Sequence, residues 1–258
     1  MATSDHDSPD TPPSDSPDGR TDAWQETPLW YSVARSVVTH YWVFTLVVTA
    51  FILWGVALAP EIDWYLAGLL VVAVALGLEG MHDIDLADPT VAVDIDPAVQ
   101  RRVGYALIGA GTALGLYIAS LTTWWVLVLV LVQLVGGLAY NAEWFDGLFH
   151  DLDQLGWLTA GLTLGFTPVV TGHYVIAQSI SLSAILWAVV AAVYSVGILH
   201  LYQAVKIPVL YEVVGVQTVR PMDMDEEETY DLVGTGLFGV LLATILSGVA
   251  FVVTAAGF

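Results

Sequence analysis

A cluster of acidic residues and one histidine follows the second long apolar run of the chain. It consists of Glu79, His82, Asp83, Asp85 and Asp88. Carboxylates gathered at a membrane boundary are costly unless they share a cation. A hard cation such as Mg²⁺ prefers oxygen ligands and can bridge carboxylates to a diphosphate. The cluster therefore indicates a cation site, and the plain alternative is an acidic loop at a helix end.

A second polar stretch follows the fourth apolar run. Its polar residues are Tyr140, Asn141, Glu143, Asp146, His150, Asp151 and Asp153. On a helix, Glu143, Asp146 and His150 would share one face, because they are spaced i, i+3, i+7. The spacing indicates either a second set of ligands or an amphipathic helix at the membrane surface whose polar face meets water.

A third polar group follows the sixth apolar run and consists of His200 and Lys206. Lys206 is the only lysine of the chain. A lone histidine is more often a packing residue than a ligand. Lys206 can bind a phosphate or anchor its helix to lipid headgroups.

Glu79 and His82 also form the E-x-x-H unit found in di-iron carboxylate bundles. The residues that could complete such a site are Glu143, Asp146, His150, His200 and Glu212. A second E-x-x-H unit is absent from the sequence. A membrane di-iron oxidoreductase is therefore kept as an alternative function.

These polar clusters are joined to apolar runs of membrane length. Of the 258 residues, 57% are hydrophobic and 12% are charged, whereas soluble domains are about 25% charged. A membrane span needs about 20 apolar residues, with a range of about 17–25. Seven runs qualify, and they predict an all-α transmembrane bundle: 41–59, 64–80, 103–119, 122–139, 155–177, 180–202 and 232–257. A further short helix is expected over 207–219.

The charge and the cysteine count exclude several classes of function. The net charge of −20 repels phosphate backbones, so nucleic acid is not an expected partner. With no cysteine, disulfides and thiolate metal sites are excluded. Residues 1–28 are rich in Asp, Ser and Pro and are expected to be a disordered acidic tail, which leaves 29–258 as the transmembrane domain.

All the basic residues fall on one side of the predicted spans: Arg20, Arg35, Arg101, Arg102, Lys206 and Arg220. The positive-inside rule then predicts a multi-pass protein of the cell membrane with a cytoplasmic N-terminus. The three polar clusters lie on the same side. This convergence predicts one polar pocket at the cytoplasmic boundary, suited to a substrate with a charged head and an apolar tail.

From about residue 30 to 206 the sequence resembles the UbiA superfamily of intramembrane prenyltransferases. The stretch AVALGLEGMHDIDLADPT stands in the place of the family's first aspartate motif, followed by Arg101-Arg102 and GYALIGAGTALGLYIA. The stretch VQLVGGLAYNAEWFDGLFHDLDQLGWLTAGLTLGFTPVVTGHYV resembles the family's second motif and glycine-rich fifth span. The excess of acids over lysine resembles proteins of salt-loving archaea.

The resemblance implies a UbiA-like bundle in which Mg²⁺ binds a prenyl diphosphate, whose prenyl group passes to a lipophilic acceptor. Asp83 and Asp88 would bind metal, with His82 and Asp85 beside them. A second metal would be bound by Asp146, Asp151 and Asp153. Residues implied to bind substrate are Arg102, Lys206, His200 and Asn141, and Tyr140 would face the prenyl cation through its ring.

The sequence departs from the family's pattern in several places. His82 stands where an asparagine is expected, and the aspartates read D-x-D-x-x-D. The second motif lacks the usual lysine, and the chain has about two spans fewer than the usual nine. A non-catalytic scaffold or lipid-binding relative is therefore the alternative to a prenyltransferase.

Overall fold

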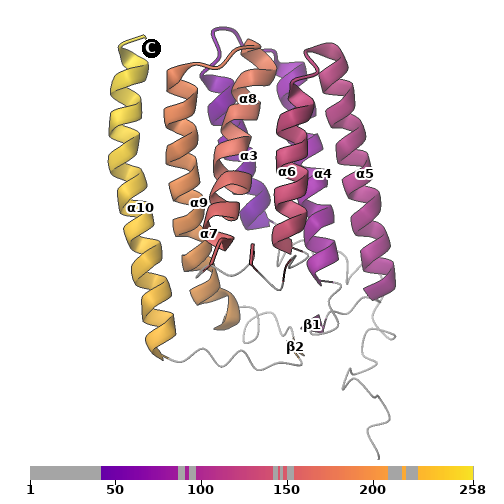
Figure 1. Ribbon diagram of the computed structural model, residues 1–258, viewed down its shortest axis with the longest axis vertical. Helices are drawn as coiled ribbons and strands as arrows, with labels where there is room; N and C mark the ends of the chain where they lie inside the picture. The colour runs from indigo at the N-terminus through magenta and orange to yellow at the C-terminus, as the bar shows by residue number, and fades with distance from the viewer. Residues whose placement is uncertain are drawn as a thin grey trace, which may run out of the picture.

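The computed structural model describes residues 42–86, 91–92, 97–141, 145, 148–149, 154–208, 217–218 and 226–257. The predicted acidic tail, 1–28, lies outside these residues. The described part is a bundle of long helices that stand side by side (Figure 1). The predicted all-α membrane bundle is thereby confirmed at the level of fold class.

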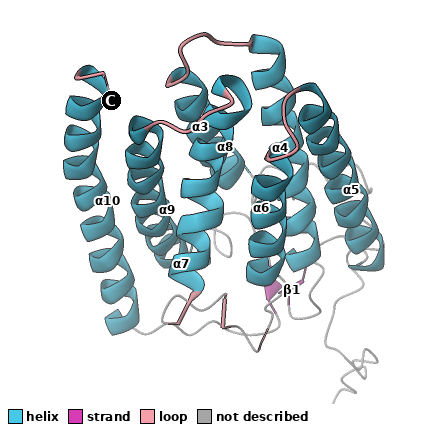
Figure 2. Ribbon diagram, turned by 45° about the horizontal axis from the view of Figure 1, so that its top comes forward, coloured by secondary structure: helices cyan, strands magenta, loops and turns pink. Residues whose placement is uncertain are grey.

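The helices are α3 (Trp42–Ala57), α4 (Trp64–Leu86), α5 (Pro97–Leu121), α6 (Val126–Asn141), α7 (Gly156–Ala160), α8 (Thr167–Ala177), α9 (Leu182–Pro208) and α10 (Glu226–Ala255). A π-helix, η2 (Gly161–Phe166), joins α7 to α8. Two short strands, β1 (Val91–Ala92) and β2 (Gln217–Thr218), pair antiparallel. Figure 2 shows loops joining the helices at one end of the bundle.

Five segments in the described residues are long and apolar enough to cross a membrane. They are Trp64–Ile84, Ala98–Leu121, Gly156–Ala177, Leu182–Ala204 and Thr229–Ala255. Two shorter apolar helices, Thr45–Ala57 and Val126–Tyr140, accompany them. The protein is accordingly a multi-pass membrane protein.

Four helices extend about six residues beyond the predicted apolar runs at the end of the bundle that carries the polar clusters, which we call the motif end (lower part of Figure 1). There α4 continues to Leu86 and α9 to Pro208, while α5 begins at Pro97 and α10 at Glu226. The apolar runs stop earlier because hydropathy marks only the part within lipid, whereas a helix can continue into water with charged side chains. His82, Asp83 and the backbone of Asp85 are therefore helical.

The expected helix over 207–219 is wrong at its C-terminal end. Residues 217–218 form strand β2, whose Thr218 pairs with Val91 and whose Gln217 pairs with Ala92. Val and Thr are β-branched and favour strands, a preference that the apolar spacing did not reveal. Pro208 ends α9, and residues 209–216 lie outside the described part.

Glycines permit the closest helix contacts. A β-carbon added to Gly80 of α4 would collide with the carbonyl oxygen of Gly104 of α5, and one added to Gly172 of α8 would collide with that of Ile52 of α3. A β-carbon added to Gly197 of α9 would likewise lie 2.9 Å from the carbonyl oxygen of Gly236 of α10. Since lipid tails are as apolar as leucine, such close backbone packing is a main source of association between membrane helices.

Large aromatic side chains are exposed at the end opposite the motif end. Trp64, Tyr65, Trp124 and Trp125 each expose more than half of their surface. Tryptophan and tyrosine are enriched at membrane–water interfaces. These residues therefore mark the level of one membrane surface.

Candidate functional site

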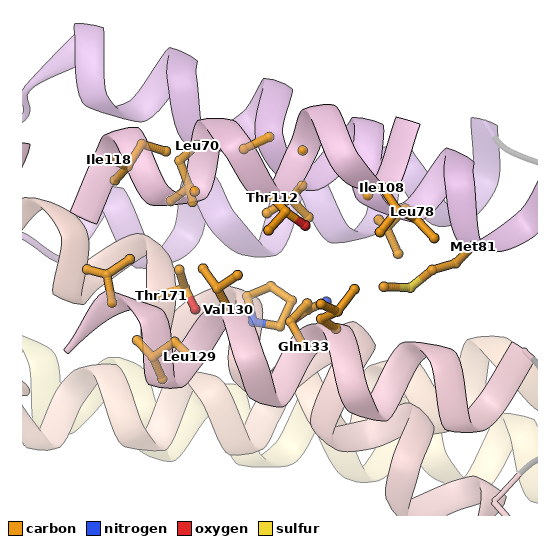
Figure 3. Close-up of a pocket in the computed structure, with 18 residues that line it drawn as sticks. Leu70, Leu78, Met81, Ile108, Thr112, Ile118, Leu129, Val130, Gln133 and Thr171 are labelled. Atoms are coloured by element: carbon orange, nitrogen blue, oxygen red, sulfur yellow. The ribbon is translucent and has the colours of Figure 1, made fainter. Parts of the chain in front are cut away.

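A mainly apolar cleft lies between α4, α5, α6 and α8 (Figure 3). Its volume is about 680 Å³, including the opening. Along α4 it extends from Leu70 to Met81, which is about 16 Å at the rise of 1.5 Å per residue. The other lining residues are Ala73, Val74, Gly77, Leu78, Ile108, Gly111, Thr112, Gly115, Ile118, Val126, Leu129, Val130, Gln133, Leu134, Pro168 and Thr171.

One wall of the cleft depends on the π-helix and on Pro168. In η2, the N–H of Thr167 donates to the carbonyl of Leu162, five residues earlier. The carbonyl of Thr163 would therefore need the N–H of residue 168, which proline lacks. The side chain of Gln133 supplies the missing donor, since its Nε2 donates to the Thr163 carbonyl oxygen at 2.6 Å. Gln133 thus joins α6 to the π-helix at the cleft.

The motif end of the cleft is formed by consecutive residues of α4 that face different neighbours. Met81 lines the cleft and contacts Gly137 of α6. A β-carbon added to Gly104 of α5 would lie 3.0 Å from the β-carbon of Asp83. The apolar cleft therefore ends within two residues of the predicted carboxylate Asp83, which lies against α5.

Glu79 is engaged by α3. The Thr45 hydroxyl donates a hydrogen bond of 2.8 Å to Oε1 of Glu79, and the pair is partly buried. Ionisable residues within a membrane span are costly and usually functional. The bond gives the Glu79 carboxylate a polar partner within the bundle, about two turns before α4 ends at Leu86.

A second group of predicted residues gathers where α6, α7 and α9 meet. Tyr140 is half-buried and packs against a cluster formed by Ala160 and Leu199, together with Tyr202. His200 is buried, with 8% of its surface exposed, and its Nδ1 lies 2.7 Å from the carbonyl oxygen of Val196 on the same helix. With Nδ1–H as the donor, Nε2 of His200 is the nitrogen left to accept a hydrogen bond.

The remaining predicted residues are placed less completely. Arg102 is exposed on α5, and His82 is half-buried on α4. Asp85, Asn141 and Lys206 lie on α4, α6 and α9, and their side chains are not described. Those that lie outside the described residues are Asp88, Glu143, Asp146, His150, Asp151, Asp153 and Glu212.

Within the described ranges, no three His, Asp or Glu side chains lie close enough together to hold one metal ion. Glu79 and Asp83 are the carboxylates that these ranges place near the cleft, and two carboxylates leave most of the coordination shell of Mg²⁺ to other ligands.

Sequence reasoning missed the polar residues inside the spans. Thr112, Gln133 and Thr171 line the cleft, and His173 is buried at the contact of α8 with α3, with 2% of its surface exposed. The signal was available, because a polar residue within an apolar run of membrane length is costly. Gln133, in the run VLVLVLVQLVGG, is the clearest example.

Known proteins give no further guide to the site. Compared with models of protein families, with curated proteins and with solved structures, the chain has no match in any of the three.

Proposed function

We propose that this protein is a UbiA-like membrane prenyltransferase that binds the tail of a prenyl diphosphate in the cleft and its head at the motif end. The prenyl group would pass to a lipophilic acceptor. The observation that carries the proposal is that an apolar cleft inside the bundle ends at Met81, next to His82 and Asp83. We further propose seven spans, with α3 and α6 included, and a cytoplasmic N-terminus.

The shape and lining of the cleft suit an apolar chain. The cleft extends about 16 Å along α4, which matches the length of an extended chain of roughly a dozen carbon atoms. Its walls are aliphatic side chains and glycines, with three polar residues among the 18 that line it. Because lipid tails are as apolar as these walls, the binding of an apolar chain there depends on its close packing against the side chains.

The motif end offers charges of both signs to a head group. Asp83 and Glu79 lie on α4, while Arg101 and Arg102 lie in the first turns of α5. Arg102 is exposed, so its guanidinium can meet a head group at this end of the bundle. We propose that Arg102 binds the diphosphate and that Mg²⁺ accompanies it, because carboxylates and a diphosphate repel each other without a cation.

The proposed transfer is balanced without a further reagent. The bond between the allylic carbon and the diphosphate oxygen breaks, and its electron pair leaves with the diphosphate. A new bond then forms from the allylic carbon to the acceptor, and the proton that the acceptor loses passes to the departed diphosphate. Tyr140 does not line the cleft, but its ring lies near the motif end of α6, beside Ala160 and Leu199, and is proposed to stabilise the cation between these steps. The apolar walls exclude water that would otherwise capture the cation.

The experiment measures binding of a non-hydrolysable prenyl diphosphate analogue to the purified protein in lipid nanodiscs, with and without Mg²⁺. Gly77 lines the cleft, and a β-carbon added there meets no atom within 4 Å. We expect Gly77→Leu to narrow the cleft and weaken binding at least tenfold. Gly68→Leu is the matched control, because Gly68 is equally open on α4 but does not line the cleft.

The head-group part is tested by Asp83→Asn, which should abolish the effect of Mg²⁺ on analogue binding. If the folded wild-type protein does not bind the analogue at any Mg²⁺ concentration, the prenyltransferase proposal is refuted and the non-catalytic scaffold is favoured. Stoichiometric iron that is lost in His82→Ala would instead favour the di-iron alternative.

A further inference from the structure

We propose that the cleft also binds, in competition with a prenyl tail and at the level of Thr112 and Gln133, an apolar chain that carries one neutral oxygen atom, such as a ketone. The oxygen would accept hydrogen bonds from the Thr112 hydroxyl and from the side-chain amide of Gln133. This inference goes beyond the proposed function, because it concerns neutral ligands and does not require a diphosphate.

Gln133 has hydrogen-bonding capacity to spare. Its side chain carries two N–H donors and one acceptor oxygen. One N–H is used on the Thr163 carbonyl, and this is the one hydrogen bond of its amide among the described residues. The second N–H and the oxygen Oε1 therefore remain available at the lining of the cleft.

Thr112 offers a hydroxyl from the opposite wall. Figure 3 shows the side chains of Thr112 and Gln133 on opposite sides of the cleft. In the part of the chain that the structure describes, no hydrogen bond of the Thr112 hydroxyl is found, although threonines in helices commonly bond a carbonyl of the preceding turn. Thr122, ten residues further along the chain, does bond the Ile118 carbonyl, at 2.8 Å.

The two groups lie at a similar depth. Thr112 precedes the end of α5 at Leu121 by nine residues, and Gln133 follows the start of α6 at Val126 by seven. At 1.5 Å per residue these positions are about 14 and 11 Å from the end opposite the motif end. The proposal therefore places the ligand oxygen between these two helices, at the level that the two side chains share.

The lipid environment makes this pair selective. Within hydrocarbon, a polar group without a partner carries its full desolvation cost. A hydrocarbon chain in the cleft would leave both donors unpaired, whereas a ketone oxygen can accept from both, since a carbonyl has two lone pairs. We expect the ketone to bind about tenfold more tightly than the hydrocarbon of equal length.

The experiment is a competition in lipid nanodiscs. A fluorescent alkyl probe is displaced by a long-chain methyl ketone or by the alkane of equal length. We expect a preference of about tenfold for the ketone in the wild type. In Thr112→Val the preference should fall to no more than about threefold, because the ketone loses one donor and the alkane no longer leaves the Thr112 hydroxyl unpaired. Thr244→Val is the control, because Thr244 lies on α10, away from the cleft, and its hydroxyl bonds the Val240 carbonyl.

Equal displacement by ketone and alkane in the wild type would overturn the inference, as would a preference that Thr112→Val leaves intact. These results are independent of the diphosphate experiment. A protein that prefers the ketone but does not bind the diphosphate analogue would support this site and refute the proposed transferase.

Discussion

The hydrogen bond from Gln133 to Thr163 leads to a quantitative prediction. The Thr163 residue is 4% exposed, so water does not readily replace the donor. Replacing Gln133 by leucine keeps the side-chain volume similar but leaves the carbonyl unpaired. An unsatisfied buried group costs about 1–3 kcal/mol, while side-chain hydrogen bonds within membranes average about 0.6 kcal/mol. We therefore expect Gln133→Leu to lower the free energy of unfolding by about 1–2 kcal/mol.

The same reasoning predicts a specific rescue. Pro168→Ala restores an N–H at the position that the π-helix register assigns to the Thr163 carbonyl. In the Pro168→Ala background, Gln133→Leu should lower the free energy of unfolding by about 1 kcal/mol less than it does with proline present. The reason is that the Thr163 carbonyl then has a backbone donor again. The coupling energy of the double-mutant cycle isolates this effect from the loss of a polar group in lipid.

The assay is equilibrium unfolding of the wild type, both single variants and the double variant under identical lipid or detergent conditions. The fluorescence of the native tryptophans reports the transition. The reasoning is refuted if Gln133→Leu is neutral, or if it costs the same, within about 0.3 kcal/mol, with proline and with alanine at position 168.

Three further predictions follow from other contacts. Gly80→Ala should destabilise the bundle by about 1–3 kcal/mol, because its β-carbon meets the backbone of α5, whereas Gly68→Ala should change stability by less than about 1 kcal/mol. Thr45→Val should cost about 1 kcal/mol in the same unfolding assay, and Thr45→Ser should restore most of it, since serine keeps the hydroxyl that bonds a carboxylate of α4. Single cysteines placed at Asp63 and Asp231 test the topology in intact cells: an impermeant thiol reagent should label the cysteine at Asp63 but not the one at Asp231. Labelling at Asp231 alone would contradict the cytoplasmic N-terminus.

The sequence was sufficient to predict the class of fold, and the reason is physical. Apolar runs of about 20 residues have few alternatives to membrane helices, because every backbone group must be bonded within lipid. All five segments long enough to span overlap a predicted run. The ends were less predictable, as α4 shows, because charged residues after Glu79 continue the helix to Leu86.

The candidate site was predicted only at its polar edge. The clusters around Asp83 and His200 are conspicuous because they interrupt apolar sequence. The cleft itself is not encoded by a local pattern, since residues of four helices line it. The hydrogen bond between Gln133 and Thr163 joins positions thirty residues apart. It forms because Pro168 lacks a backbone N–H, and a hydropathy profile carries no information about that.

The attachment of α10 through one glycine-bearing face has a consequence for how this chain can vary during evolution. Gly197, Gly236 and Gly239 bring α9 and α10 into backbone contact, while Phe238, Ile245 and other side chains of α10 are about two-thirds exposed. Selection should therefore hold the small residues fixed and let the outward ones drift among Leu, Ile, Val and Phe. Helix α10 would then keep Gly236 and Gly239 opposite Gly197 of α9, while the rest of its surface varies with the surrounding lipid.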